Sequence, residues 1–132
     1  MKTNAPARPI RIFLVDDEPR VRRGLRMRLT LEPDLEVVGE TGDGRAVLAF
    51  VTALLPDVVV MDLSMDEVDG LTATGALVRQ RPGLAVIVHS LHDSPATRCA
   101  ALKAGAVACV GKHEGPARLV AAIRAAAGIA AS

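Results

Sequence analysis

Short apolar segments alternate with longer segments of mixed polarity along most of the chain. Each apolar segment is rich in Val, Ile or Leu and is too short for a typical helix, which favours β-strands. The segment VVVM at 58–61 has no polar position at all, as expected of a strand buried on both faces. The predicted strands are residues 10–15, 35–39, 58–61, 84–90 and 106–110.

The segments between the strands have the apolar spacing of helices. Val21, Leu25 and Leu29 recur at every fourth position and mark one buried face. Gly105 stands where a helix C-cap is expected. The predicted helices are residues 19–31, 44–55, 71–80, 94–104 and 114–127.

Strand and helix alternate five times, which defines the fold class as α/β. Fully apolar strands in such a pattern predict a doubly wound (βα)5 parallel sheet with helices on both faces. One domain is expected over residues 10–127, with flexible tails at 1–9 and 128–132. Ligand sites in such sheets form outside the carboxyl ends of the strands.

Polar groups follow four of the five predicted strands. Asp16 and Asp17 follow the first strand and Asp62 follows the third. Ser90 ends the fourth strand, and Lys112 comes just after the fifth. The second strand ends in ETGDG, which offers no comparably informative group. These side chains are therefore predicted to meet at one edge of the sheet.

This set of side chains suits magnesium binding and phosphoryl chemistry. Carboxylates held close together raise each other's pKa unless a cation intervenes, and an incomplete oxygen shell completed by water is what Mg²⁺ favours. A carboxylate beside Mg²⁺ can attack phosphorus to form an aspartyl phosphate. Lys112 and the Ser90 hydroxyl could then bind the remaining phosphoryl oxygens.

The composition narrows the classes of function. The chain has 132 residues, half of them apolar, and a formal net charge of +1. Nothing in this balance indicates nucleic acid or a membrane surface as a partner. Two cysteines make no disulfide framework and fit a reducing cytoplasm. No zinc spacing is matched by the histidines and cysteines, which are His89, His92, His113, Cys99 and Cys109.

Four stretches together resemble the receiver domain of bacterial two-component response regulators. They are FLVDDEPRVRRGLR, VVVMDLSMDEVDG, VIVHSLHD and LKAGAVACVGK. The resemblance covers residues 10–127 and implies a flavodoxin-like, CheY-like sheet with strand order 2-1-3-4-5. Leu91, directly after Ser90, begins the stretch LHD, which resembles the corresponding stretch in one subgroup of receivers. Full-length members of that subgroup end in a LuxR- or NarL-type helix-turn-helix.

The resemblance also implies a role for each site residue. Asp62 is implied as the phosphoacceptor, assisted by Ser90 and Lys112. Asp17 is implied as a direct Mg²⁺ ligand, and Asp16 as a ligand acting largely through water. The full implied metal set is Asp16, Asp17, Asp62 and the carbonyl of Ser64.

The implied function is a phosphoaccepting signalling switch rather than an enzyme acting on other molecules. The expected phosphodonor is a sensor histidine kinase or a small phosphodonor, and the resemblance allows a homodimer on phosphorylation. DNA would be bound only through an output domain that these residues do not include, and no membrane contact is expected. A stand-alone receiver and a fragment of a transcription factor both stay open.

Two other functions share features with this sequence. A haloacid-dehalogenase-like phosphatase also uses an aspartate after a strand, but it places a second acid two residues on, where Ser64 stands here. A receiver-like binding module that works without phosphorylation is the second alternative. Asp62, Ser90 and Lys112 argue against it, whereas two departures from the usual receiver pattern, Cys109 and His113, leave it open.

The departures concern the loops and the switch. Asp66 stands where most receivers have proline, and His113 replaces the proline that usually follows the lysine in a cis bond. A cis bond before a non-proline residue costs about 2.5–4 kcal/mol, so either strain or a different loop is expected. Cys109 occupies the usual aromatic position.

The arginines of the first helix are predicted to form a solvated face or, alternatively, a kinase-docking surface; they are Arg20, Arg22, Arg23 and Arg26.

Overall fold

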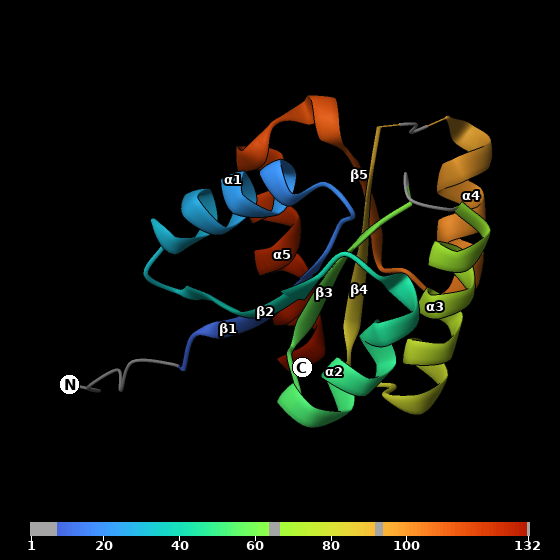
Figure 1. Ribbon diagram of the computed structural model, residues 1–132, viewed down its shortest axis with the longest axis horizontal. Helices are drawn as coiled ribbons and strands as arrows, with labels where there is room; N and C mark the ends of the chain where they lie inside the picture. The colour runs from blue at the N-terminus through green and yellow to red at the C-terminus, as the bar shows by residue number, and fades with distance from the viewer. Residues whose placement is uncertain (1–7, 64–66, 92–93, 132) are drawn as a thin grey trace.

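The chain folds around one parallel sheet of five strands in the order β2-β1-β3-β4-β5 (Figure 1). The computed structural model describes residues 8–63, 67–91 and 94–131. The strands are β1 (Ile10–Val15), β2 (Leu35–Thr41), β3 (Val58–Asp62), β4 (Ala85–Ser90) and β5 (Ala108–Gly111). Fold class and strand order are therefore confirmed.

Helices cover both faces of the sheet, with α1 and α5 on one side and α2, α3 and α4 on the other (Figure 1). Two single turns of 3₁₀-helix, η1 and η2, precede α2 and α5. The helices are α1 (Pro19–Thr30), η1 (Gly44–Ala46), α2 (Val47–Leu54), α3 (Glu67–Gln80), α4 (Pro95–Ala104), η2 (Lys112–Glu114) and α5 (Pro116–Ala131).

Alternating residues of the central strands fill two separate cores. Ile12 and Leu14 of β1 belong to the core beneath α1 and α5. Phe13 and Val15 belong to the core on the opposite face, beneath α2, α3 and α4. Phe13 also stacks on Phe50 of α2, with 5.4 Å between ring centroids. Burial on both faces explains why these strands consist mainly of apolar residues.

Two helices differ from their predicted bounds by four residues at one end. α3 begins at Glu67 rather than Leu71, because Gly70 lies inside the helix instead of breaking it. A Cβ at Gly70 would lie only 2.6 Å from Leu63 Cδ2, so glycine permits a close approach there. α5 continues through Gly128 to Ala131, although a tail was expected from that glycine. The alanines around Gly128 favour helix strongly enough to offset it.

Gly105 ends α4 as predicted, in the left-handed conformation with φ of 113°. Its main-chain N–H bonds back to Leu102 O. A Cβ at this position would lie 3.0 Å from a methyl group of Val78 on α3. Gly105 therefore meets both a backbone requirement and a steric one.

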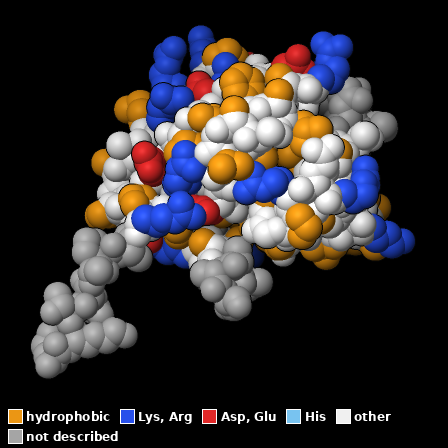
Figure 2. All heavy atoms as spheres, turned by 90° about the horizontal axis from the view of Figure 1, so that it is seen from below, with side chains coloured by type: hydrophobic (Ala, Val, Ile, Leu, Met, Phe, Trp, Pro, Cys, Tyr) orange, Lys and Arg blue, Asp and Glu red, His pale blue; other side chains and the backbone are white. Residues whose placement is uncertain are grey.

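On the face seen from below in Figure 1, hydrophobic side chains occur in several groups, and Lys and Arg side chains lie both around the margin and across the middle (Figure 2). Among the described helices, none combines the length and the apolar character that a membrane span requires.

Candidate metal and phosphoryl site

Three aspartates converge at the carboxyl edge of the sheet. β1 and β3 pair in parallel with Val15 opposite Met61, so the next residues, Asp16 and Asp62, emerge side by side. Asp16, Asp17 and Asp62 each bring one carboxylate oxygen into a group whose members all lie within 4.8 Å of one another. Asp16 and Asp62 are buried, whereas Asp17 is exposed. The arrangement fits a hard cation that prefers oxygen ligands.

Lys112 connects two of these carboxylates. Its Nζ lies 2.8 Å from Asp16 Oδ2 and 3.1 Å from Asp62 Oδ1. Burial by itself lowers the pKa of Lys112, but the hydrogen bond that Lys112 donates to Asp16 and the charges of Asp62 and Asp16 outweigh it, so the pKa is raised. The ammonium group is therefore held charged at the point where negative charge collects.

The Asp16 carboxylate is engaged on both oxygens. Oδ1 accepts a hydrogen bond of 2.9 Å from the Glu18 main-chain N–H, and Oδ2 accepts the bond from Lys112. The main-chain N–H of Asp16 donates to Thr41 O at 3.1 Å. These contacts fix the turn that carries Asp16 and Asp17.

Ser90 is buried at the carboxyl end of β4, opposite Gly111 of β5 in the sheet register. Its strand is next to β3, whose last residue is Asp62. The sheet thus brings all but one of the predicted site residues to one edge. The exception is Ser64, which lies outside the described residues, as do two other residues singled out in the sequence, Asp66 and His92.

His89 lies on the other side of β4 from Ser90 and is buried, as expected. Burial, followed by the charge of Lys112, lowers the pKa of His89 to about 4. Within the described part of the chain, its Nδ1 has no hydrogen-bond partner. His89 lines a cavity of about 440 Å³ between α1 and the start of α5, together with Val21, Gly24, Leu25, Arg28, Leu91, Lys112, Gly115 and Pro116.

The loop after Lys112 differs from the usual receiver pattern. All described peptide bonds are trans, including Lys112–His113, and residues 112–114 form η2. Glu114 Oε2 accepts a 2.6 Å hydrogen bond from Gly111 N–H. It also lies 3.4 Å from Arg98 Nη2, and Arg98 Nη1 donates to Cys109 O at 2.9 Å. Of the two expectations for His113, a strained cis bond or a different loop, the structure shows the different loop, which Glu114 stabilises.

The side chain of Cys109 is buried in the core beneath α2, α3 and α4. Across residues 8–63, 67–91 and 94–131, the aspartate cluster is the only group of three or more His, Cys, Asp or Glu residues placed to hold a metal ion. The described histidines and cysteines do not belong to it.

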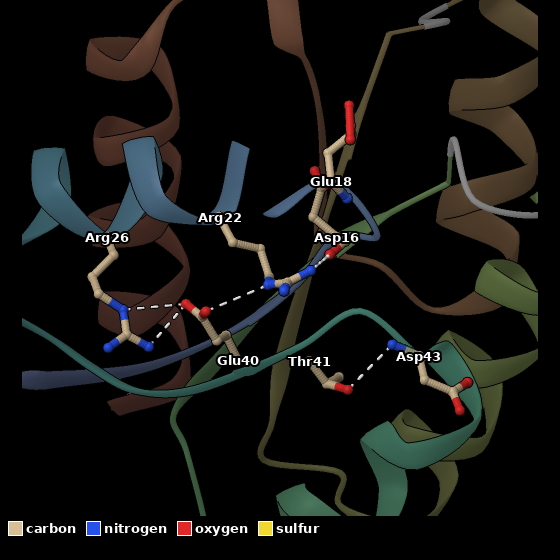
Figure 3. A network of polar contacts seen from close by, with 7 residues as sticks. All are labelled: Asp16, Glu18, Arg22, Arg26, Glu40, Thr41 and Asp43. Carbon is tan, nitrogen blue, oxygen red and sulfur yellow. Dashed lines mark hydrogen bonds and ion pairs between the residues drawn. The ribbon is translucent and has the colours of Figure 1, made fainter. Parts of the chain in front are cut away.

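Sequence reasoning missed a polar network beside the acidic turn (Figure 3). Arg22 donates to the main-chain oxygen of Asp16 and to Glu40 Oε1, so it is not part of a solvated face. Arg26 donates to Glu40 Oε2 at 2.8 Å. A signal was available: Arg22 and Arg26 stand one helical turn apart, and Glu40 is a charged residue in the following strand. Glu40 opens the stretch ETGDG, which by its sequence is less informative than the other strand ends.

The fold and the acidic edge define a receiver-type α/β protein, and comparison with known proteins gives the family. The family described as "Response regulator receiver domain" matches residues 12–124. The chain therefore belongs to the response regulator receiver family. Rival assignments to a phosphatase or to a phosphate-independent module are not favoured.

The chain resembles parts of curated proteins of different kinds. It is 44% identical over 108 residues to a protein-glutamate methylesterase/protein-glutamine glutaminase of Anaeromyxobacter dehalogenans, covering 81% of this chain and 32% of the relative. It is 42% identical over 114 residues to the transcriptional regulatory protein UhpA of Salmonella typhimurium, covering 86% and 57%. The chain thus spans about a third to somewhat over half the length of these curated relatives.

A solved structure shows the same fold. The two-component response regulator of the LuxR family from Aurantimonas sp. SI85-9A1 superposes with a TM-score of 0.86 at 34% sequence identity. The match covers 91% of this chain and 86% of that chain. This likeness agrees with the LuxR/NarL-type subgroup indicated by Leu91.

Proposed function

We propose that Asp62 accepts a phosphoryl group in a two-component signalling system, with Mg²⁺ bound by Asp16, Asp17 and Asp62. The observation that carries this proposal is the position of Lys112 Nζ, 2.8 Å from Asp16 and 3.1 Å from Asp62. Phosphoryl transfer spreads negative charge over the oxygens of the transferred group, and this charge must be neutralised. The ammonium of Lys112 and the cation-binding cluster can do so beside Asp62.

The residues divide the work as follows. An Asp62 oxygen forms the new bond to phosphorus while the bond from phosphorus to the donor breaks and the donor leaves with its electron pair. Bound Mg²⁺ supplies charge neutralisation for the phosphoryl oxygens. Lys112 holds a further oxygen as a point charge, and the Ser90 hydroxyl donates to another. Asp17 is exposed and suits direct metal binding, whereas Asp16, engaged on both oxygens, suits contact through water.

The donor is proposed to be a sensor histidine kinase, reached across α1 and the start of α5. The cavity of about 440 Å³ in that region is lined mostly by apolar side chains and includes Lys112 of the site. The exposed arginines Arg20 and Arg23 would favour a partner with acidic residues.

We further infer a cytoplasmic switch that assists its own phosphorylation. It would form a homodimer or act on an output domain, and would reach DNA only through such a domain.

Intact-mass spectrometry after incubation with Mg²⁺ and acetyl phosphate tests the proposal. One phosphoryl group is expected on the unchanged protein and none on Asp62→Asn, because the amide is a far weaker nucleophile than the carboxylate. The unchanged protein with a chelator in place of Mg²⁺ is the matched control and should gain little mass. Full labelling of Asp62→Asn would refute the assignment of the phosphoacceptor.

A further inference from the structure

Arg22 lies between the acidic turn and the end of β2 (Figure 3). One terminal nitrogen donates to the main-chain oxygen of Asp16, and Nε lies 3.4 Å from Glu40 Oε1. Its side chain is only 17% exposed, whereas that of Arg26, which pairs with the same glutamate, is 50% exposed. Only one of these two arginines is therefore inserted against the turn that carries Asp16 and Asp17.

Gly42 provides the space for this guanidinium. A Cβ on Gly42 would lie 2.9 Å from Arg22 Nη1, and 3.6 Å from both Asp16 O and Asp17 Cα. The φ angle of Gly42 is not left-handed, so the backbone does not require glycine there. The close contact is with the far end of a flexible side chain, which a methyl group can push aside. A side chain at position 42 would thus displace Arg22 with little effect on the main chain.

The turn is held on both sides of the Asp16 residue. On one side its N–H donates to Thr41 O at 3.1 Å. On the other side its carbonyl accepts from Arg22, and this carbonyl belongs to the peptide group that leads into Asp17. Rotation of that peptide group would redirect the Asp17 carboxylate, so the Arg22 contact limits the positions open to a proposed metal ligand.

We propose that Arg22, seated against Gly42, is a positioning residue that fixes the Asp16–Asp17 peptide and thereby sets the affinity of the acidic cluster for a divalent cation. This inference rests on the cation site of the proposed function and does not depend on phosphorylation of Asp62. Groups that orient metal ligands without touching the metal commonly tune metal affinity. Glu40 anchors the guanidinium, and Arg26 binds Glu40 without reaching Asp16.

The test is the Mg²⁺ dissociation constant, measured by calorimetry on three folded variants without any phosphodonor. Arg22→Gln and Gly42→Ala are each expected to raise it by about tenfold, the lower end of the usual effect of losing such an orienting contact. Gly42→Ala keeps every charge, so it separates positioning from charge removal. Arg26→Gln is the matched control, because it removes an ion pair to Glu40 but leaves the Asp16 carbonyl held; its constant should stay within about twofold.

Thermal unfolding without Mg²⁺ separates positioning from general stability. Arg22→Gln and Arg26→Gln should both lower the melting temperature slightly, since each loses a contact with Glu40, while only Arg22→Gln changes Mg²⁺ affinity. Unchanged affinity in both Arg22→Gln and Gly42→Ala, or an equal loss in Arg26→Gln, would overturn the positioning role. Failure of the unchanged protein to bind Mg²⁺ would instead refute the cation site itself, and this role with it.

Discussion

At Lys112, burial and pairing act in opposite directions on one ammonium group. Burial disfavours the charge, but Asp16 and Asp62 favour it more strongly, and the pKa of Lys112 is raised. The same contacts neutralise two buried carboxylates that would otherwise repel each other. Lys112 therefore contributes to stability in the resting protein, besides its proposed contact with the phosphoryl group.

Replacing Lys112 with methionine should have opposite effects on folding and on metal binding. Without Mg²⁺, the free energy of unfolding should fall by roughly 3–5 kcal/mol, because two buried carboxylates lose their cation. Mg²⁺ should bind more tightly, since a positive charge next to its ligands is gone. Chemical denaturation and calorimetry measure the two effects, and Lys103→Met, an exposed change on α4, is the control. Weaker Mg²⁺ binding in Lys112→Met would contradict this account.

His89 predicts a pH dependence of stability. Its pKa is lowered to about 4 in the fold, chiefly by burial, with the charges of Lys112, Asp16 and Glu114 also acting on it. The unfolded chain, with a pKa near 6.5, therefore takes up the proton first as the pH falls. The contribution of neutral His89 is fully present above about pH 6.5 and is lost progressively toward pH 4.

The expected loss at pH 5 is on the order of 2 kcal/mol in the unfolding free energy. His89→Leu should remove this part of the pH dependence. Carboxylates titrate in both proteins, so the informative quantity is the difference between their unfolding free energies at pH 7 and pH 5, measured with a chelator present. The same pH dependence in both proteins would show that His89 does not control it.

At the scale of elements, strands were easier to predict than helix ends. β1, from Ile10 to Val15, was predicted residue for residue, because its last four residues are apolar and buried and Asp16 ends the apolar segment sharply. The start of α3 was missed because the fit of Gly70 against Leu63 involves residues that only the fold brings together. Arg22 was missed for the same reason: its partners are Asp16 O, just after β1, and Glu40 on β2.

The connection between α4 and β5 gives a prediction about glycine. Gly105→Ala should lower the free energy of unfolding by at least about 1–2 kcal/mol, because alanine is strained at positive φ and its Cβ would approach Val78. Gly24→Ala is the contrasting variant. A Cβ there meets nothing within 4 Å, and alanine should stabilise the middle of α1 by about 1 kcal/mol. Equilibrium denaturation of both variants provides the measurement.

For the molecule as a whole, cation binding and folding should be coupled. The proposed ligands come from the ends of β1 and β3, near the middle of the sheet, so the site exists only when the sheet is formed. A ligand that binds only the folded state stabilises it according to its concentration relative to its dissociation constant. Cation binding at three aspartates is therefore expected to change the free energy of unfolding of the whole domain.

Mg²⁺ at one hundred times its dissociation constant should add about 2.7 kcal/mol to the free energy of unfolding. Asp17→Asn should lose most of this gain, because it removes a proposed ligand. Without Mg²⁺ it should be at least as stable as the unchanged protein, because repulsion among the carboxylates is relieved. Denaturation with and without Mg²⁺, using Asp43→Asn as a surface control, measures both effects. A full Mg²⁺ gain in Asp17→Asn would remove Asp17 from the ligand set.

The stacked pair Phe13 and Phe50 accounts for every aromatic ring of the Phe, Tyr and Trp type in the sequence, which has no tyrosine or tryptophan. The protein therefore has very little near-ultraviolet absorbance, and its concentration must be measured through peptide absorbance or amino-acid analysis. The lack of intrinsic tryptophan fluorescence is useful for optical titration. A single tryptophan introduced at the exposed Leu91, directly after Ser90, would be the sole strong fluorophore and could report cation and phosphoryl binding without background.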